Sequence, residues 1–430
     1  MKIIKNLNKA NVSWALYDWA NSAYATTVLA VFFPVFLSEY WSEGADPSVT
    51  TSRLGAANSL AGLIIMAAAP VLGTLSDISP VKKKYLAAAT ITGAISTAAM
   101  FFVPGGAWIA ALALFTLSSV CFSAGIIFYD ALINSVAEKK LLNFVSGVGY
   151  SFGYLGGGIL LAVNIFTVTN YEFFGLSSST EAVKYVFVSV GVWWIIFAVP
   201  LFLNVKEKHS NKTGKLPFIN TLTSSLRQLK ITLSQIKEIR SVWLFLIAYW
   251  LYIDGVDTII RMAMDFGLSI GLERNSLITA LLITQFVGFP SALITGIMFK
   301  GGKGARTGIF ITICAYFMIT VLGAMMRSEL HFYMLAVSVG LVQGGIQALS
   351  RSYYASIIPE NKEGEFFGFY NMIGKFAVIL GPLFIAGTNI TARQFGFSQD
   401  TASRCGVLSV AVFFILGGII FYMSGRDRQG

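Results

Sequence analysis

The stretch from Gly340 to Gly381 reads GLVQGGIQALSRSYYASIIPENKEGEFFGFYNMIGKFAVILG. It places polar and charged side chains inside two segments that are otherwise apolar enough to cross a bilayer. In the second segment Asn371 and Lys375 lie one helical turn apart. A charge at membrane depth costs at least a few kcal/mol, so we expect Lys375 to face a partner or a cavity. The first segment carries four polar residues on one helical face: Gln343, Gln347, Ser350 and Tyr354. The pattern predicts a transport pathway.

The composition indicates a protein that crosses the membrane many times. Of 430 residues, 55% are hydrophobic and 12% are charged, and the mean hydropathy is +0.70. This leaves too little polar surface for a water-soluble globular protein. We therefore predict an all-α membrane protein with twelve spans. They lie at 12–38, 53–75, 85–103, 107–135, 143–168, 183–204, 241–266, 275–299, 307–326, 331–357, 365–389 and 403–424.

Basic residues are distributed unequally between the two sides of the predicted membrane. With the N-terminus in the cytoplasm, six of the 31 Lys and Arg fall outside and two fall within the membrane, so 23 fall inside. This bias predicts a multi-pass protein of the inner (plasma) membrane with both termini in the cytoplasm. The net charge of +10 then reflects membrane orientation, and we expect no nucleic-acid partner.

The two halves of the chain repeat weakly. Two six-helix halves around a site at mid-depth are the architecture of a secondary transporter. We therefore predict bundles at 1–204 and 241–430, joined by a cytoplasmic linker at 205–240. One set of residues recurs after 221 positions and another after 236: Gly147 and Gly153 with Gly368 and Gly374, and Asp18 and Asn21 with Asp254 and Asp257.

The predicted linker contains eight basic residues. Its second half has an apolar stripe at helical spacing, which favours an amphipathic helix lying on the inner leaflet. A solvated connection between the two bundles is an alternative of equal weight. The stripe consists of Leu222, Leu226, Leu229 and Leu233.

The predicted seventh span carries the densest charge. Asp254, Asp257, Arg261 and Asp265 are three, four and four residues apart and share one helical face. One interpretation is a site for protons or a substrate amine formed by Asp254 and Asp257. The other is an Asp257–Arg261 ion pair that only positions helices. We expect Asp254 to take up and release the coupling proton, because its own helix offers no partner one turn away.

Three further charged residues are candidates, namely Asp18 in the first span and Asp130 and Arg351 at the inner ends of their helices. Asp18, in the first span, either pairs with Lys375 or titrates. Asp130 could pair with Arg351 at matching depth, and we expect both of these residues to act as gates or anchors.

The segment GTLSDISPVKKK, from Gly73 to Lys84, resembles the loop motif of the major facilitator superfamily, and GIMFKGGKGAR is a weaker copy. Ile78 and Pro80 depart from the pattern, and Lys300 stands where the first copy has Asp77. The resemblance implies that Asp77 latches the halves on the cytoplasmic side. An ordinary helix end followed by cytoplasmic lysines is the alternative.

Five places together resemble the so-called unknown major facilitator family, which includes autophagy-related vacuolar amino-acid effluxers. The resemblance implies the major facilitator fold, alternating access and export of a small, amino-acid-like or zwitterionic solute. Lipid-like, peptide or drug cargo is the second choice. The places are LYDWANSAYATTV, FYDALINSVA, VSGVGYSFGYLGGG, YIDGVDTI, and QGGIQALSRSYYASIIPE with EFFGFYNMIGKFAVILGP.

Other classes of protein are disfavoured. A membrane-embedded enzyme needs converging catalytic groups, and neither HExxH nor an intramembrane histidine occurs. The lack of GxxxxGK[ST] argues against an ATP-driven pump. The three cysteines show neither disulfide nor metal-ligand spacing. We expect a monomer without metal or cofactor whose partners are a solute, protons or another coupling ion, and membrane lipids. A channel is a weaker alternative, because it needs no repeated halves.

Overall fold

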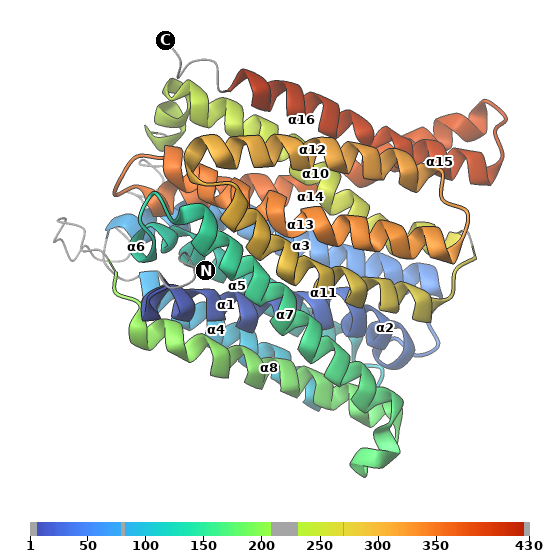
Figure 1. Ribbon diagram of the computed structural model, residues 1–430. Helices are drawn as coiled ribbons and strands as arrows, with labels where there is room; N and C mark the ends of the chain where they lie inside the picture. Colours follow the sequence, from blue (N-terminus) through green and yellow to red (C-terminus); the bar gives the residue numbers. More distant parts are fainter. Residues whose placement is uncertain (1–6, 79–81, 208–230, 270, 425–430) are drawn as a thin grey trace. The chain divides into compact units, whose positions relative to one another are not determined.

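The computed structural model of the chain describes residues 7–78, 82–207, 231–269 and 271–424 (Figure 1). Within these ranges every regular element is a helix. Twelve helical segments of the described chain are long and apolar enough to span a membrane. The predicted fold class, an all-α membrane protein with twelve spans, is confirmed.

The first span shows how local sequence starts a helix. The Asn8 side chain accepts the Asn11 N–H at 2.9 Å, and the Asn11 side chain accepts the Asn8 N–H at 2.9 Å. This reciprocal cap satisfies two amides that the first helical turn leaves open. The helix then widens into π-helical turns at Tyr24–Phe32 and Leu37–Trp41. The span covers Lys9–Trp41, a few residues more at each end than predicted.

The first compact unit comprises Met1–Ala137, Phe152–Thr221 and Glu363–Gly368, as far as these residues are described. In it α1 packs on α8, α4 packs on α5 and α8, and α3 packs on α5. Small residues allow close approach. A Cβ on Gly191, for example, would lie 2.7 Å from the Ala94 carbonyl oxygen. The helices are α1 (Lys9–Ala23), α2 (Phe33–Phe36), α3 (Pro47–Ile78), α4 (Lys82–Ala99), α5 (Trp108–Ala131), α6 (Ile133–Val136), part of α7 (Leu142–Thr169), α8 (Ser179–Asn204) and the first turns of α14 (Glu363–Gln394).

The second compact unit comprises Glu138–Ser151, Leu222–Lys362 and Phe369–Gly430, again as far as described. In it α11 and α12 pack on α13, and α10 and α12 pack on α16. The first turns of α7 therefore belong to this unit. Its other helices are α10 (Arg240–Ser269), α11 (Arg274–Met298), α12 (Gly301–Ala324), α13 (Glu329–Ile357), most of α14, α15 (Gln399–Ser409) and α16 (Ala411–Met423).

The predicted linker falls largely outside the described residues. Leu222, Leu226 and Leu229 lie in the undescribed part, so the amphipathic stripe stays a prediction. Residues 231–238 are helical, and Leu233 in this segment is exposed. The domain limits at 1–204 and 241–430 also stay a prediction.

Candidate transport site

Asp254 lies in α10 with its side chain completely inside the second unit, at 0% exposure. Its Oδ1 atom accepts the backbone N–H of Gly381 at 2.8 Å and the Thr258 hydroxyl at 3.3 Å. Its Oδ2 atom is also buried, and none of the described residues hydrogen-bonds to it. A buried carboxylate oxygen without a donor is unfavourable unless it carries a proton or binds another ligand.

The Gly381 position explains how the carboxylate reaches the backbone of α14. A Cβ there would overlap the Thr258 side chain and lie 2.8 Å from Asp254 Oδ1, so only glycine fits. The next residue, Pro382, stands inside the helix and has no N–H. The carbonyl of residue 378 therefore lacks its ordinary helical donor. The two residues together interrupt the hydrogen bonding of α14 beside Asp254.

A second group of charges extends along the same unit. The Asp257 carboxylate interacts electrostatically with both Arg261 and Lys375. Asp257 and Lys375 are half-buried, whereas the Arg261 side chain is exposed. The fourth residue of the charged stripe, Asp265, has a side chain outside the described part. The structure thus places Lys375 of α14 near the charged face of α10, within electrostatic reach of Asp257.

The polar face of α13 runs from the surface into the protein. Gln343 and Gln347 are half-buried, as is Asn371 on α14. Ser350 and Tyr354 are fully buried. The Ser350 hydroxyl lies 2.6 Å from the Tyr252 hydroxyl of α10. The buried end of this polar face therefore holds α13 against α10, and its half-buried part is accessible.

Asp18 occupies an aromatic environment in the first unit. The Tyr129 hydroxyl donates to Asp18 Oδ2 at 2.7 Å. Trp14 stacks on the Tyr129 ring at 4.4 Å, and its indole N–H donates to the Tyr129 carbonyl at 3.1 Å. Asn21 is buried one turn further along α1. The predicted pair of Asp18 with Lys375, a residue of the second unit, stays a prediction.

Arg351 is only 2% exposed in α13 and joins this helix to the start of α7. Its Nε donates to the Ser146 hydroxyl at 3.0 Å, and its Nη2 donates to the Ser146 carbonyl at 3.1 Å. The guanidinium also lies 4.2 Å from the centre of the Tyr150 ring. Asp130 is buried at the end of α5 in the first unit, and its predicted pair with Arg351 stays a prediction.

Asp77 caps a helix from another part of the chain. Residue 362, at the start of α14, is a lysine and gives no side-chain cap. Asp77 Oδ1 instead accepts the Gly364 N–H at 2.9 Å, and Oδ2 accepts the Glu365 N–H at 2.8 Å. These are the amides that a capping side chain ordinarily serves, at the positive end of the helix. Lys82 adds an ion pair to Asp77 Oδ1 at 2.8 Å.

Asn143, which sequence reasoning missed, makes the corresponding contact in the second unit. Its side-chain amide donates to the carbonyl of Phe299 at 2.5 Å, where α11 ends, and to that of Gly301 at 2.9 Å, the first residue of α12. Ser146 and Tyr150 were also missed as functional residues. All three lie in or just before the segment VSGVGYSFGYLGGG, which carries the repeated glycines and was the available signal.

Comparison with known proteins places the chain in a family. The family described as "Vacuole effluxer Atg22 like" matches residues 7–429. An "Uncharacterized MFS-type transporter YxiO" of Bacillus subtilis (strain 168) is 36% identical over 421 residues, which cover 97% of this chain and 95% of the relative. "Autophagy-related protein 22" of Yarrowia lipolytica is 27% identical over 271 residues, which cover 56% of this chain and 44% of the relative.

Solved structures show the same fold at low sequence identity. The crystal structure of the human organic anion transporter MFSD10 (TETRAN) has a TM-score of 0.69 at 14% identity, and the match covers 96% of this chain and 99% of that one. The resemblance that the sequence motifs indicated is thus confirmed, and an enzymatic function is excluded by the family. The chain belongs to the Atg22-like family, and it is a transporter of the major facilitator type.

Proposed function

We propose that the chain is a secondary active transporter that exports a small zwitterionic, amino-acid-like solute by alternating access, driven by protons. We further propose that it acts as a monomer in the plasma membrane with both termini in the cytoplasm. The name of the family, which describes vacuole effluxers, supports export. The inner excess of Lys and Arg supports the orientation.

The observation that carries proton coupling is the asymmetry of the Asp254 carboxylate. Oδ1 receives two hydrogen bonds from the protein, and Oδ2 receives none from the described residues. A proton on Oδ2 can therefore come and go without breaking the contacts that hold the side chain. Pro382 leaves the carbonyl of residue 378 without its helical donor, and free backbone carbonyls of this kind coordinate coupling ions in other transporters.

The charges of Asp257, Arg261 and Lys375 support a zwitterionic cargo. A free amino acid carries one carboxylate and one ammonium group, and this face of α10 and α14 offers groups of both signs. In the proposal Arg261, whose side chain is exposed, receives the carboxylate, and Asp257 receives the ammonium group. Gln343, Gln347 and Asn371 supply neutral hydrogen-bonding groups on the accessible part of the neighbouring helices.

We assign gating to the contacts at the helix ends. Asp77 holds the start of α14 against α3, and Asn143 holds the start of α7 against α11. Arg351 strengthens the second contact through Ser146. Release of these contacts would open the cytoplasmic side in the proposed cycle, with Asp130 as a further anchor there.

The cargo is tested first by a thermal-shift screen of the purified protein against amino acids, organic acids, sugars and nucleosides. A ligand that binds the folded state raises its apparent stability. We expect amino acids to raise the melting temperature. If only another class of compound raises the melting temperature, the proposed cargo is wrong, whereas the proposed coupling mechanism is unaffected.

Coupling is tested in proteoliposomes with a solute that the screen identifies. Asp254→Asn should abolish accumulation driven by a pH gradient and preserve exchange of solute down its own gradient, because only the protonation step is removed. Asp400→Asn is the control, since this carboxylate of the same unit is exposed and pairs with Arg404 at 2.9 Å. If Asp254→Asn still accumulates solute against its gradient, the coupling residue lies elsewhere and Asp18 becomes the next candidate.

A further inference from the structure

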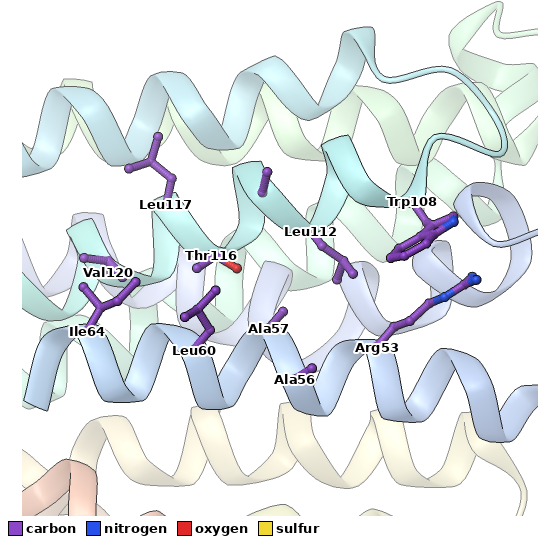
Figure 2. A pocket seen from close by; sticks show the side chains of 11 residues that line it. Arg53, Ala56, Ala57, Leu60, Ile64, Trp108, Leu112, Thr116, Leu117 and Val120 are labelled. Atoms are coloured by element: carbon purple, nitrogen blue, oxygen red, sulfur yellow. The ribbon is translucent and has the colours of Figure 1, made fainter.

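An apolar groove runs along the exposed side of α3 and α5 in the first unit (Figure 2). Its volume is about 570 Å³. Figure 2 shows Leu60 and Ile64 of α3 pointing toward α5, with Arg53 and Trp108 together at one end. The lining consists of Arg53, Ala56, Ala57, Leu60, Ile64, Trp108, Leu112, Ala113, Thr116, Leu117 and Val120.

The chemistry of the lining fits lipid tails better than water or a polar solute. Apart from Arg53 and Trp108 at its end, the only polar side chain in it is Thr116. Leu60, Ile64 and Leu117 are large apolar side chains that are between 41% and 52% exposed. Exposed apolar side chains of this size on a spanning helix suit contact with acyl chains better than contact with water.

The length of the groove matches one leaflet. Arg53 and Ile64 are eleven residues apart on α3, which corresponds to about 16 Å of helix at roughly 1.5 Å per residue. Half of a hydrocarbon core of about 30 Å is nearly the same distance. Arg53 and Trp108 lie near the ends of their spans, which begin at Val49 and Trp108. The charged end of the groove is therefore at the membrane surface and its other end is near the bilayer centre.

The state of Arg53 indicates what the groove binds. Its guanidinium carbon lies 3.9 Å from the centre of the Trp108 ring, so one flat face is held by a cation–π contact. Of the residues that the structure describes, no carboxylate pairs with it. The N–H groups around the edge of the guanidinium plane thus stay available, and their fork geometry matches phosphate oxygens.

We propose that this groove is a binding site for an anionic phospholipid. The phosphate binds Arg53, and one acyl chain lies along Leu60, Ile64 and Leu117. The lipid occupies the side of α3 and α5 as a bound component. This inference is independent of the proposed cargo and of proton coupling.

Native mass spectrometry of the full chain tests the site. The protein is mixed in detergent with equal amounts of phosphatidylglycerol and phosphatidylcholine that carry identical acyl chains. We expect the wild type to retain phosphatidylglycerol about fivefold more, the preference that one basic group near a membrane surface provides. Arg53→Gln should remove this preference. Lys184→Gln is the matched control, because Lys184 also lies over an aromatic ring, that of Tyr40 at 4.8 Å, but lines no part of the groove.

A second pair of variants tests the acyl-chain part. Leu60→Trp should fill the groove and lower retention of both lipids, while Ile196→Trp on α8 should change nothing. The two residues are similarly exposed, at 52% and 56%, so both variants should fold, and size-exclusion chromatography checks this. Equal retention of the two lipids by the wild type, or an unchanged preference in Arg53→Gln, would overturn the proposal. So would normal lipid retention by Leu60→Trp.

Discussion

Two helix-end contacts, one in each unit, solve the same problem with opposite chemistry. Where α3 ends, the Asp77 carboxylate accepts two N–H groups from the start of α14. Where α11 ends and α12 begins, the carbonyls of Phe299 and Gly301 accept N–H groups from the Asn143 side chain at the start of α7. In the first contact the side chain is charged and accepts. In the second it is neutral and donates.

The sequence repeat relates the helices of one contact to the helices of the other. Asn143 precedes Gly364 by 221 residues, the interval that also relates Gly147 to Gly368. Asp77 precedes Lys300 by 223 residues. In the first contact the interacting side chain stands at the end of α3, whereas in the second it stands at the start of α7. The direction of the hydrogen bonds is reversed accordingly.

The helix dipole explains this reversal. A helix start presents N–H groups and positive potential, which a carboxylate satisfies best, whereas a helix end presents carbonyls, which need a donor. Hydrogen bonds to a charged group contribute about 1.5–3 kcal/mol, and neutral ones about 0.5–1.5 kcal/mol. The Asp77 contact should consequently be the stronger one and the only one of the two that depends on charge.

The largest loss of stability should come from replacing the glycine at which the two helices of each contact pack closely. A Cβ on Gly368 would lie 2.6 Å from the Ala69 carbonyl oxygen, and one on Gly147 would lie 2.7 Å from that of Ala292. Because backbone cannot move aside, Gly368→Ala or Gly147→Ala should each weaken its own contact by about 3 kcal/mol.

Cysteine labelling measures both contacts in a chain whose three native cysteines are replaced by serine. Ser76→Cys reports on the α3–α14 contact and Ala292→Cys on the α7–α11 contact, since both positions are buried. The maleimide reaction follows the population of the open form. Each glycine variant should accelerate labelling of the cysteine in its own contact roughly a hundredfold. Equal acceleration at both cysteines would refute the view that the two contacts open separately.

Asp77→Asn should have the next largest effect. The substitution removes the charge and places an NH₂ group against one of the two amides of α14. We expect a loss of about 2 kcal/mol, which corresponds to roughly thirtyfold faster labelling of Ser76→Cys. Labelling of Ala292→Cys serves as the internal control. An unchanged reporter in a well-folded variant would contradict the role of Asp77 as a latch.

Substitutions of Asn143 test the reversed polarity. Asn143→Ala should cost about 1 kcal/mol and accelerate labelling of Ala292→Cys about fivefold, because two neutral hydrogen bonds are lost. Asn143→Asp should loosen the contact further than Asn143→Ala, since a carboxylate would face two carbonyl oxygens. If Ala292→Cys is labelled more slowly in Asn143→Asp than in Asn143→Ala, the contact does not require a hydrogen-bond donor at this position.

Lys82→Gln should have the smallest effect. Lys82 pairs with Asp77 at 2.8 Å, but Asp77 keeps its two amide donors in α14 when the lysine is replaced, so we expect about 0.5 kcal/mol, or roughly a twofold change in labelling of Ser76→Cys. The difference between Lys82→Gln and the wild type should shrink as salt is added, because salt screens the pair. A difference that persists in high salt would indicate a packing role for the lysine instead.

The charged residues of the candidate site could be found from sequence, but most of their partners could not. The expectation that α10 offers Asp254 no partner one turn away is wrong, because the Thr258 hydroxyl donates to its Oδ1 at 3.3 Å. Its other partner, the Gly381 N–H, is 127 residues distant. Asn143 and Ser146 carried no signal of their own, because small polar residues are common in membrane helices and their role depends on which helix end packs beside them.

What the sequence by itself determined was the class, the number of spans and the family. A bilayer about 30 Å thick requires apolar segments of a fixed length, so hydropathy alone locates each span to within a few residues. Charged residues inside those spans can also be identified as functional candidates from sequence, because burying a charge in a bilayer costs free energy.

Only the tertiary structure decided which backbone groups those charges meet. The Asp77 carboxylate caps α14 because α3 ends beside it, and the Asp254 carboxylate meets α14 because a glycine precedes a proline there. A hydrogen bond between distant segments depends on the packing of whole helices. That packing is set by many small contacts at once, and no short stretch of sequence records it.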